Sequence, residues 1–317
     1  MLTFVARRLA LAVFSLIGIS IVTFALIRLI PGSAIDYRVG TAVGLTGQQV
    51  AILKHYFGLD VPIWKQYFIW IGEVLRGNLG VSFQSGAPVL QLILSRVPIT
   101  AELSFWALLI ALAIGLPLGT ISALHPDSWL DAASRGVSLI GLSIPNFWLG
   151  TLLILLFSTV IPWLPNSQTY ATLTENPGLN LEQNVLPALA LGLAVAGSMM
   201  RMTRGAVIDV LSEEYVRTAR AKGVRWLGVV IRHVLRNALI PIITTAGMMA
   251  GYLLTGAVII EQIFNIPGVG RLLLTSILGR DYPVVEGTVL VIAVAFVLSN
   301  LAADVAYGFA DPRIRQG

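Results

Sequence analysis

The chain has 317 residues, of which 56% are hydrophobic and only 12% are charged, and its mean hydropathy is +0.83. Soluble domains carry roughly 25% charged residues, so this composition excludes an ordinary soluble protein and indicates a membrane protein. The formal net charge of +5 is explained by arginines retained in cytoplasmic loops, which argues against nucleic acid as a partner. The chain has no cysteine, which excludes disulfides, thiolate metal sites and cysteine nucleophiles.

Residues 1–31 are predicted to form the first transmembrane helix. Arg7 and Arg8 precede an apolar run of about 20 residues, the length that crosses the hydrocarbon core of a bilayer. A signal peptide has a shorter apolar region of about 7–15 residues, so we expect this helix to be retained. The two arginines place the N-terminus in the cytoplasm, because short cytoplasmic segments are rich in Lys and Arg.

The next segment, residues 32–97, is too long for a simple connection and too polar to cross a membrane. We therefore expect it to form a small folded lid on the extracytoplasmic side. Its aromatic residues are interpreted as the core of the lid or as a belt at the membrane interface, in preference to a stacking platform for a ligand. They are Tyr56, Phe57, Trp64, Tyr67, Phe68 and Trp70.

Residues 98–309 are predicted to form a core of five further transmembrane helices, which makes the fold all-α, a polytopic membrane protein with six helices in total. Six crossings bring both termini to the cytoplasm. A loop rich in Gly and Pro, residues 261–282, is expected on the outer side, either as a surface loop or re-entering the membrane. The five apolar runs are 99–124, 137–161, 183–202, 238–260 and 283–309, and residues 310–317 are a cytoplasmic tail.

Prolines and glycines inside these runs predict how the helices bend and pack. Pro117 is expected to bend the second helix and Pro145 lies inside the third; such prolines are tolerated where neighbouring helices or water satisfy the freed carbonyls, which favours a bundle around a cavity. Gly192 and Gly197 are expected to interrupt the fourth helix. In the fifth, small residues predict the close approach of another helix; they are Gly247, Gly251 and Gly256.

Motifs for enzymatic chemistry are missing. A phosphate-binding loop ends in Gly-Lys-Ser/Thr, and none of the three lysines lies in that context. The histidines do not form His-Glu-x-x-His, and no Gly-x-Ser-x-Gly motif provides a serine nucleophile. We therefore predict no catalytic residue, no metal site and no cofactor in this chain, and expect His233 to pack or hydrogen-bond locally.

Ionisable residues inside or near the apolar runs are the remaining places for chemistry in the membrane. Most of them lie close to the end of a predicted helix, where packing or snorkelling to the interface explains them, and they do not form the chain of acids that a proton relay needs. These residues are Arg28, Glu102, Glu261, Glu286 and Asp304.

The most polar stretch of the core is the cytoplasmic segment 203–237, which we call the coupling segment. Residues 201–236 contain eight basic and three acidic side chains. A helix is predicted over 213–222, with Tyr215 and Ala219 on one side, Arg217 and Arg220 on the other, and Gly223 as its C-terminal stop. Two alternatives are open on these grounds: docking into a groove of a partner protein, or binding of anionic lipid head groups.

Twelve sequence blocks carry a resemblance to a known family. They include YVRTARAKG (215–223), RNALIP (236–241), SIPNFWLG (143–150), GAVIIEQIFNIPGVGRLL (256–273) and DPRIR (311–315). In order and spacing they resemble the inner-membrane permease subunits of bacterial ABC importers, in the dipeptide, oligopeptide and nickel branch. The resemblance covers essentially the whole chain.

The resemblance implies the type I importer fold, with the lid between helices 1 and 2 and a coupling helix for ATPase subunits between helices 4 and 5. Arg217 stands where the broader importer pattern has Glu, so it does not supply that pattern's carboxylate contact. The implied coupling residues are Glu214, Tyr215, Arg217, Thr218, Ala219, Ala221, Lys222, Gly223, His233, Arg236 and Asn237.

The resemblance also implies a set of partners in the bacterial inner membrane: a homologous second permease, two ATP-binding subunits that hold ATP and Mg, an extracytoplasmic substrate-binding protein, and membrane lipid. The expected function is import of di- or oligopeptides. Alternatives are a nickel complex, glutathione, an opine or a sugar as substrate, a stand-alone channel or proton-coupled carrier, and an intramembrane hydrolase.

Overall fold

The structure, a computed structural model, describes residues 2–29, 60–161 and 169–310. These residues are helical and contain no strand beyond one isolated β-bridge, so the predicted all-α class is confirmed. The elements are α1 (Leu2–Leu29), α4 (Ile63–Leu75), α5 (Val89–Leu94), α6 (Val97–Leu124), α7 (Trp129–Ser143), α8 (Asn146–Thr159), α9 (Pro177–Leu211), α10 (Glu214–Ala221), α11 (Trp226–Val229), a π-helical turn η1 (Val230–Leu235), α12 (Arg236–Ile263), α13 (Val269–Leu278) and α14 (Tyr282–Ala310).

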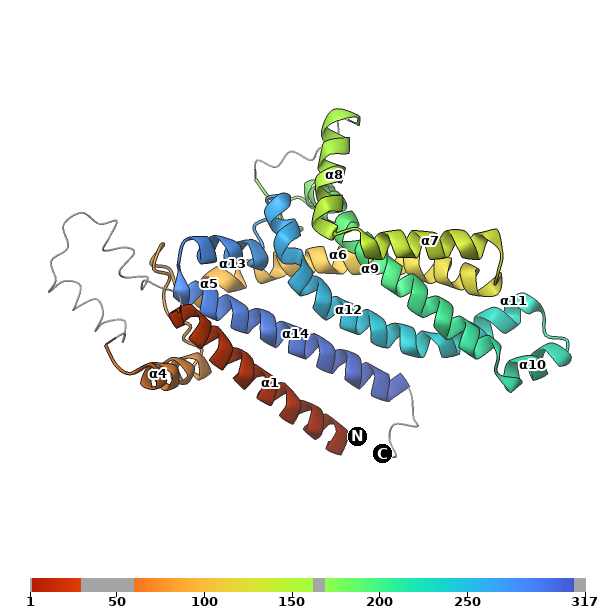
Figure 1. Cartoon of the computed structure of the whole chain (residues 1–317), viewed down its shortest axis with the longest axis horizontal. Helices are drawn as coiled ribbons and strands as arrows, with labels where there is room; N and C mark the ends of the chain where they lie inside the picture. Colours follow the sequence, from red (N-terminus) through yellow and green to blue (C-terminus); the bar gives the residue numbers. More distant parts are fainter. Residues whose placement is uncertain (1, 30–59, 162–168, 311–317) are drawn as a thin grey trace.

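Long helices lie side by side in a bundle whose two ends carry different short elements (Figure 1). One end carries α4, α5 and α13. The other carries α10, α11 and the turn between α6 and α7, and α1 begins and α14 ends toward this same end. Among the described residues, five helical stretches are long and apolar enough to cross a membrane, and the pair α7 and α8 makes a sixth if it is counted as one broken span.

The third predicted helix is not one straight span from 137 to 161. The chain turns by 99° between α7 and α8, so α8 leaves the bundle almost at a right angle (Figure 1). Ile144 is extended, with φ −83° and ψ 121°, because the ring of Pro145 disfavours helical geometry in the preceding residue. Pro145 therefore breaks this helix, whereas Pro117 lies inside the unbroken α6.

The fourth predicted helix is longer than 183–202, and the expected interruption at its glycines is wrong. α9 runs for 35 residues through the centre of the bundle and packs on α6, α7, α8 and α12. A Cβ on Gly192 would lie 2.7 Å from the Ala107 carbonyl oxygen, and one on Gly197 would lie 2.7 Å from that of Ser138. These glycines therefore mark close helix contacts, not breaks.

The small residues of the fifth helix act as predicted at two of their three positions. A Cβ on Gly247 of α12 would lie 2.4 Å from the Cβ of Ala303 in α14, and one on Gly251 would lie 3.1 Å from the ring of Phe296. At Gly256 the nearest side-chain atom would be 3.8 Å away. The two closest contacts join α12 to α14.

Two ion pairs hold α1 against α14, one toward each end of the pair. Arg8 contacts Asp304 at 2.9 Å, and Arg28 pairs with the buried Glu286. The interpretation of Arg28 and Glu286 as packing residues is thereby confirmed.

Part of the lid lies outside the described residues, including Tyr56 and Phe57. In the described part, α4 packs on α1: Phe24 contacts the rings of Tyr67 and Trp70, with centroid distances of 5.3 and 5.4 Å. Trp64 and Phe68 lie on the exposed face of α4.

Candidate functional site

The coupling segment folds as a short helix with a defined end. Glu214 lies in the first turn of α10 and Arg220 in the last, and both charges complement the helix dipole. The backbone of Gly223 is left-handed, with φ +77°. Gly223 N–H donates to the Arg220 carbonyl (2.9 Å) and Val224 N–H to the Ala219 carbonyl (3.3 Å), the hydrogen-bond pattern of a Schellman motif. Gly223 therefore ends the helix, as the sequence predicts.

One face of α10 is buried against the chain's own core. Val216 and Ala219 are 1% and 9% exposed, and they belong to the same buried cluster as Val207, Val229 and Val234. Ala219 therefore faces the body of the protein. The side of α10 that carries Ala219 is occupied within the chain, because the apolar Val216 packs against the core on the same side.

Three predicted coupling residues meet where α10 approaches the start of α12. The amide of Asn237 donates to the Tyr215 hydroxyl oxygen (2.6 Å) and to the His233 carbonyl (3.1 Å). His233 lies in the π-helical turn η1, directly before α12. These bonds fix α10 to the base of a helix that runs the length of the bundle. His233 contributes its backbone to this junction.

A cation–π contact closes the turn after α10. The guanidinium carbon of Arg220 lies 3.9 Å from the centroid of the Trp226 ring in α11. Such contacts contribute about 0.5–1 kcal/mol at exposed sites. Arg220 is therefore engaged within the coupling segment.

The opposite face of this region is exposed and mainly basic. Because the inner face is already packed, this outer face is the surface that a partner would meet. Its chemistry is that of charge and hydrogen bonding, and it contains no nucleophile–base pair. All predicted coupling residues except Ala219 and His233 are exposed, namely Glu214, Tyr215, Arg217, Thr218, Ala221, Lys222, Gly223, Arg236 and Asn237.

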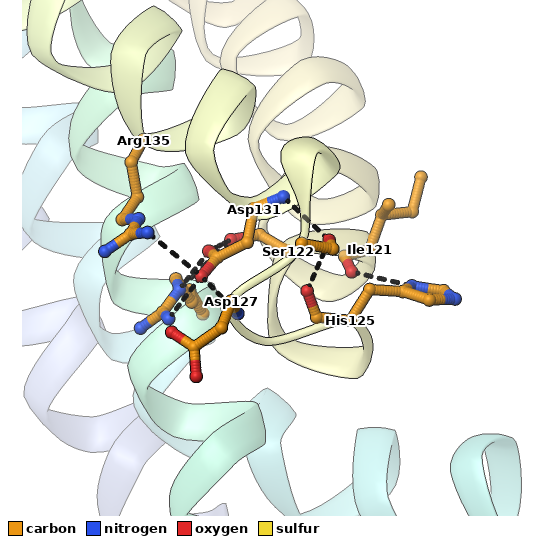
Figure 2. A network of polar contacts seen from close by, with 8 residues as sticks. Ile121, Ser122, His125, Asp127, Asp131 and Arg135 are labelled. Atoms are coloured by element: carbon orange, nitrogen blue, oxygen red, sulfur yellow. Dashed lines mark hydrogen bonds and ion pairs between the residues drawn. The ribbon is translucent and has the colours of Figure 1, made fainter.

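A buried carboxylate lies next to the coupling segment, at the turn between α6 and α7 (Figure 2). Asp131 is fully buried, and the Arg204 guanidinium of α9 donates to both of its oxygens, at 2.8 and 3.0 Å. Ser122 of α6 donates to the same carboxylate, and Arg135 lies 3.5 Å from it. Asp131 therefore joins three helices at a single point.

Sequence reasoning counted Arg204 only as a positive charge and did not single out Asp131. One local signal was present: Ser128 accepts a hydrogen bond from the Asp131 N–H at 3.3 Å and caps α7. Ser-x-x-Asp before an apolar run marks a helix start. That signal places the start of the helix near 129. The partnership with Arg204, 73 residues away, has no local signature.

The other end of the bundle has its own buried carboxylate, which sequence reasoning placed near a helix end. Glu261 of α12 is fully buried and accepts hydrogen bonds from the Thr100 hydroxyl and the Arg271 N–H. Thr100 in turn accepts from the Val269 N–H. Glu261 and Thr100 thus accept hydrogen bonds from backbone N–H groups in the first turn of α13. In the described residues, no three His, Cys, Asp or Glu side chains are grouped to hold a metal ion.

Comparisons with known proteins agree with this architecture. The profile "Binding-protein-dependent transport system inner membrane component" matches residues 115–316, and the profile "Binding-prot-dependent transport system membrane comp, N-term" matches residues 1–104. A Di/tripeptide transport system permease protein DppB of Pseudomonas aeruginosa is 42% identical, and a Dipeptide transport system permease protein DppB of Escherichia coli is 39% identical; each alignment covers 99% of both chains.

A solved structure shares the fold. The permease chain in a structure of the MetNI methionine ABC transporter, described as inward facing, superposes with a TM-score of 0.56 at 20% identity, over 70% of this chain and 97% of the other. Because the two profiles together span nearly the whole chain and the relatives match it end to end, the chain belongs to the binding-protein-dependent transport system inner membrane components, the permease subunits of ABC importers.

Proposed function

We propose that this chain is the permease subunit of a peptide importer, and that together with a homologous second permease it forms the path for di- or oligopeptides across the bacterial inner membrane. The names of the relatives support peptides as the substrate: di- and tripeptides in Pseudomonas aeruginosa, dipeptides in Escherichia coli, and a putative peptide system in Brucella abortus. Each of these proteins matches this chain over its full length.

The outer face of α10 is proposed as the docking surface for the ATP-binding subunits. The observation that carries this assignment is the anchoring of α10: its inner face is buried, and Asn237 ties it to the start of α12. A movement of α10 would therefore be transmitted directly to the long helix α12. ATP and Mg²⁺ belong to the partner subunits, and this chain contributes no catalytic group.

The proposed orientation places α10, the start of α1 and the end of α14 in the cytoplasm. The exposed arginines and lysine of the coupling segment support this assignment, because short cytoplasmic segments retain positive charge. An extracytoplasmic binding protein would then deliver substrate at the end that carries α4, α5 and α13. Closure of the ATPases would favour one of two arrangements of the bundle over the other, and α10 would transmit the movement of the ATPases to the helices.

The test is a comparison of two glycines. Gly223 and Gly77 both have left-handed backbones, φ +77° and +82°, and a Cβ would meet nothing within 4 Å at either. Replacement by Ala therefore imposes similar backbone strain at both, about 1 kcal/mol. In complexes co-expressed with the ATPase subunits, we expect Gly223→Ala to reduce ATPase co-purification and ATP-driven dipeptide uptake, and Gly77→Ala to leave both unchanged.

If Gly223→Ala and Gly77→Ala showed the same ATPase co-purification and the same dipeptide uptake, α10 would not be the docking element. Binding of the purified chain to anionic vesicles with no ATPase recruitment would favour the lipid-binding alternative for the coupling segment. Dipeptide transport by this chain alone in liposomes would instead establish a stand-alone carrier.

A further inference from the structure

An open cavity of about 410 Å³ lies at the break between α7 and α8 and is bordered by α9 and α12. This volume is within the roughly 300–1,000 Å³ of small-molecule sites. Met249 and Tyr252 line it from α12. Met249 lies about 20 Å along a helix about 42 Å long, so the cavity is near the middle of the bundle.

Four neutral polar side chains line this cavity: Ser143, Asn146, Ser198 and Tyr252. None of them makes a hydrogen bond with any other residue that the structure describes. Serine and threonine hydroxyls in helices commonly donate to a carbonyl one turn earlier, as Thr151 does to Phe147 at 2.9 Å. Ser143 and Tyr252 are exposed and Asn146 and Ser198 are half-buried, so these four side chains keep their hydrogen-bonding capacity for a molecule that enters the cavity.

The four groups come from four separate elements, α7, α8, α9 and α12, and converge because Pro145 breaks the helix. Ser143 ends α7 and Asn146 begins α8, so the break brings both to the cavity. Tyr252 is 54% exposed. No charged side chain lines the cavity among the described residues. The site offers hydroxyl and amide groups, which donate and accept, without an ion that would hold a charged substrate tightly.

We propose that this cavity is a peptide-binding station in the translocation path, in which Ser143, Asn146, Ser198 and Tyr252 hydrogen-bond to peptide backbone amides during transit. The proposal rests on the peptide import proposed above. Amide and hydroxyl groups replace part of the water that a peptide loses at this depth, and they do so for any side-chain sequence. A neutral site also releases its ligand readily, which a transport path requires.

The first test uses the absence of cysteine in the chain. Single variants Ser143→Cys and Ser198→Cys are assembled in the complete importer, in proteoliposomes, and treated with a small water-soluble thiol reagent during ATP-driven uptake of dialanine. We expect both to react, and dialanine to slow the reaction. Thr174→Cys, exposed between α8 and α9, is the control and should react at a rate that dialanine does not change.

The second test measures uptake by the conservative variants Tyr252→Phe and Asn146→Leu. Loss of one hydrogen bond to the passing peptide is expected to reduce the initial rate about five-fold, with ATPase co-purification unchanged. Thr151→Val, which removes a hydroxyl from the same helix as Asn146 but bonded within the helix, should keep the rate of the unmodified complex.

The outcomes separate the two proposals. If the unmodified complex does not import dialanine or any longer peptide, the proposed function fails. If it imports peptides, but dialanine protects neither cysteine and the rates of Tyr252→Phe and Asn146→Leu match that of Thr151→Val, the peptide station is overturned.

Discussion

The carboxylate of Asp131 accepts a bidentate pair of hydrogen bonds from Arg204, from Nε at 2.8 Å and from Nη2 at 3.0 Å, across 73 residues of sequence. This contact joins the start of α7 to α9 two turns before α9 ends and α10 begins.

Asp131→Asn is expected to destabilise the protein by about 1–3 kcal/mol, because it removes the charge that the Arg204 guanidinium meets in a buried position. The measurement is thermal unfolding of the purified complex in detergent. Asp209→Asn, at an exposed position of α9, is the matched control and should leave the melting temperature unchanged. An equally small effect of both would mean that the contact does not stabilise the fold.

Tyr215→Phe and Asn237→Ala are expected to be coupled. Each removes one partner of the same 2.6 Å hydrogen bond, so the double variant should lose less stability than the sum of the singles, by about 0.5–1.5 kcal/mol. Thr218→Val, whose hydroxyl bonds within α10, should add independently to Asn237→Ala. Strict additivity of Tyr215→Phe with Asn237→Ala would show that the bond does not join α10 to α12.

Arg28→Ala is expected to cost about 3–5 kcal/mol, because it leaves the buried Glu286 without its cation. Arg76→Ala is the control: its partner Glu73 is exposed, and water replaces the lost contact. The difference is read from thermal unfolding of the two variants. Partial recovery of Arg28→Ala by a second change, Glu286→Gln, would follow from removal of the orphaned charge; no recovery would contradict this explanation.

Gly247→Ala is expected to destabilise the packing of α12 on α14 by about 1–3 kcal/mol, since the added methyl group overlaps the Cβ of Ala303. Ala303→Gly in the same chain should restore much of the loss by vacating that space. Gly205→Ala has no neighbouring atoms within 4 Å and should be neutral or slightly stabilising. If Ala303→Gly did not restore stability, the overlap with Ala303 would not be the cause of the loss in Gly247→Ala.

Local features decided which predictions held. The left-handed end of α10 was predictable, because glycine has no Cβ and adopts positive φ at Gly223 without steric strain, directly after a run of residues that form a helix. The role of Gly192 and Gly197 was not, because a glycine inside an apolar run serves equally as a helix break or as a contact surface. Only the position of Ala107 and Ser138 on neighbouring helices decides between the two.

By itself, the sequence determined the class of protein, the approximate number of membrane helices, the positive charge of the coupling segment and the family. These properties follow from local hydropathy, charge and motif order, which the chain carries before it folds. The tertiary structure alone decided the 99° turn at Pro145, the inward face of α10, the partnership of Asp131 with Arg204, and the convergence of Ser143, Ser198 and Tyr252 on one cavity. Each depends on packing between residues far apart in the chain, and no local pattern specifies which distant helix supplies the partner.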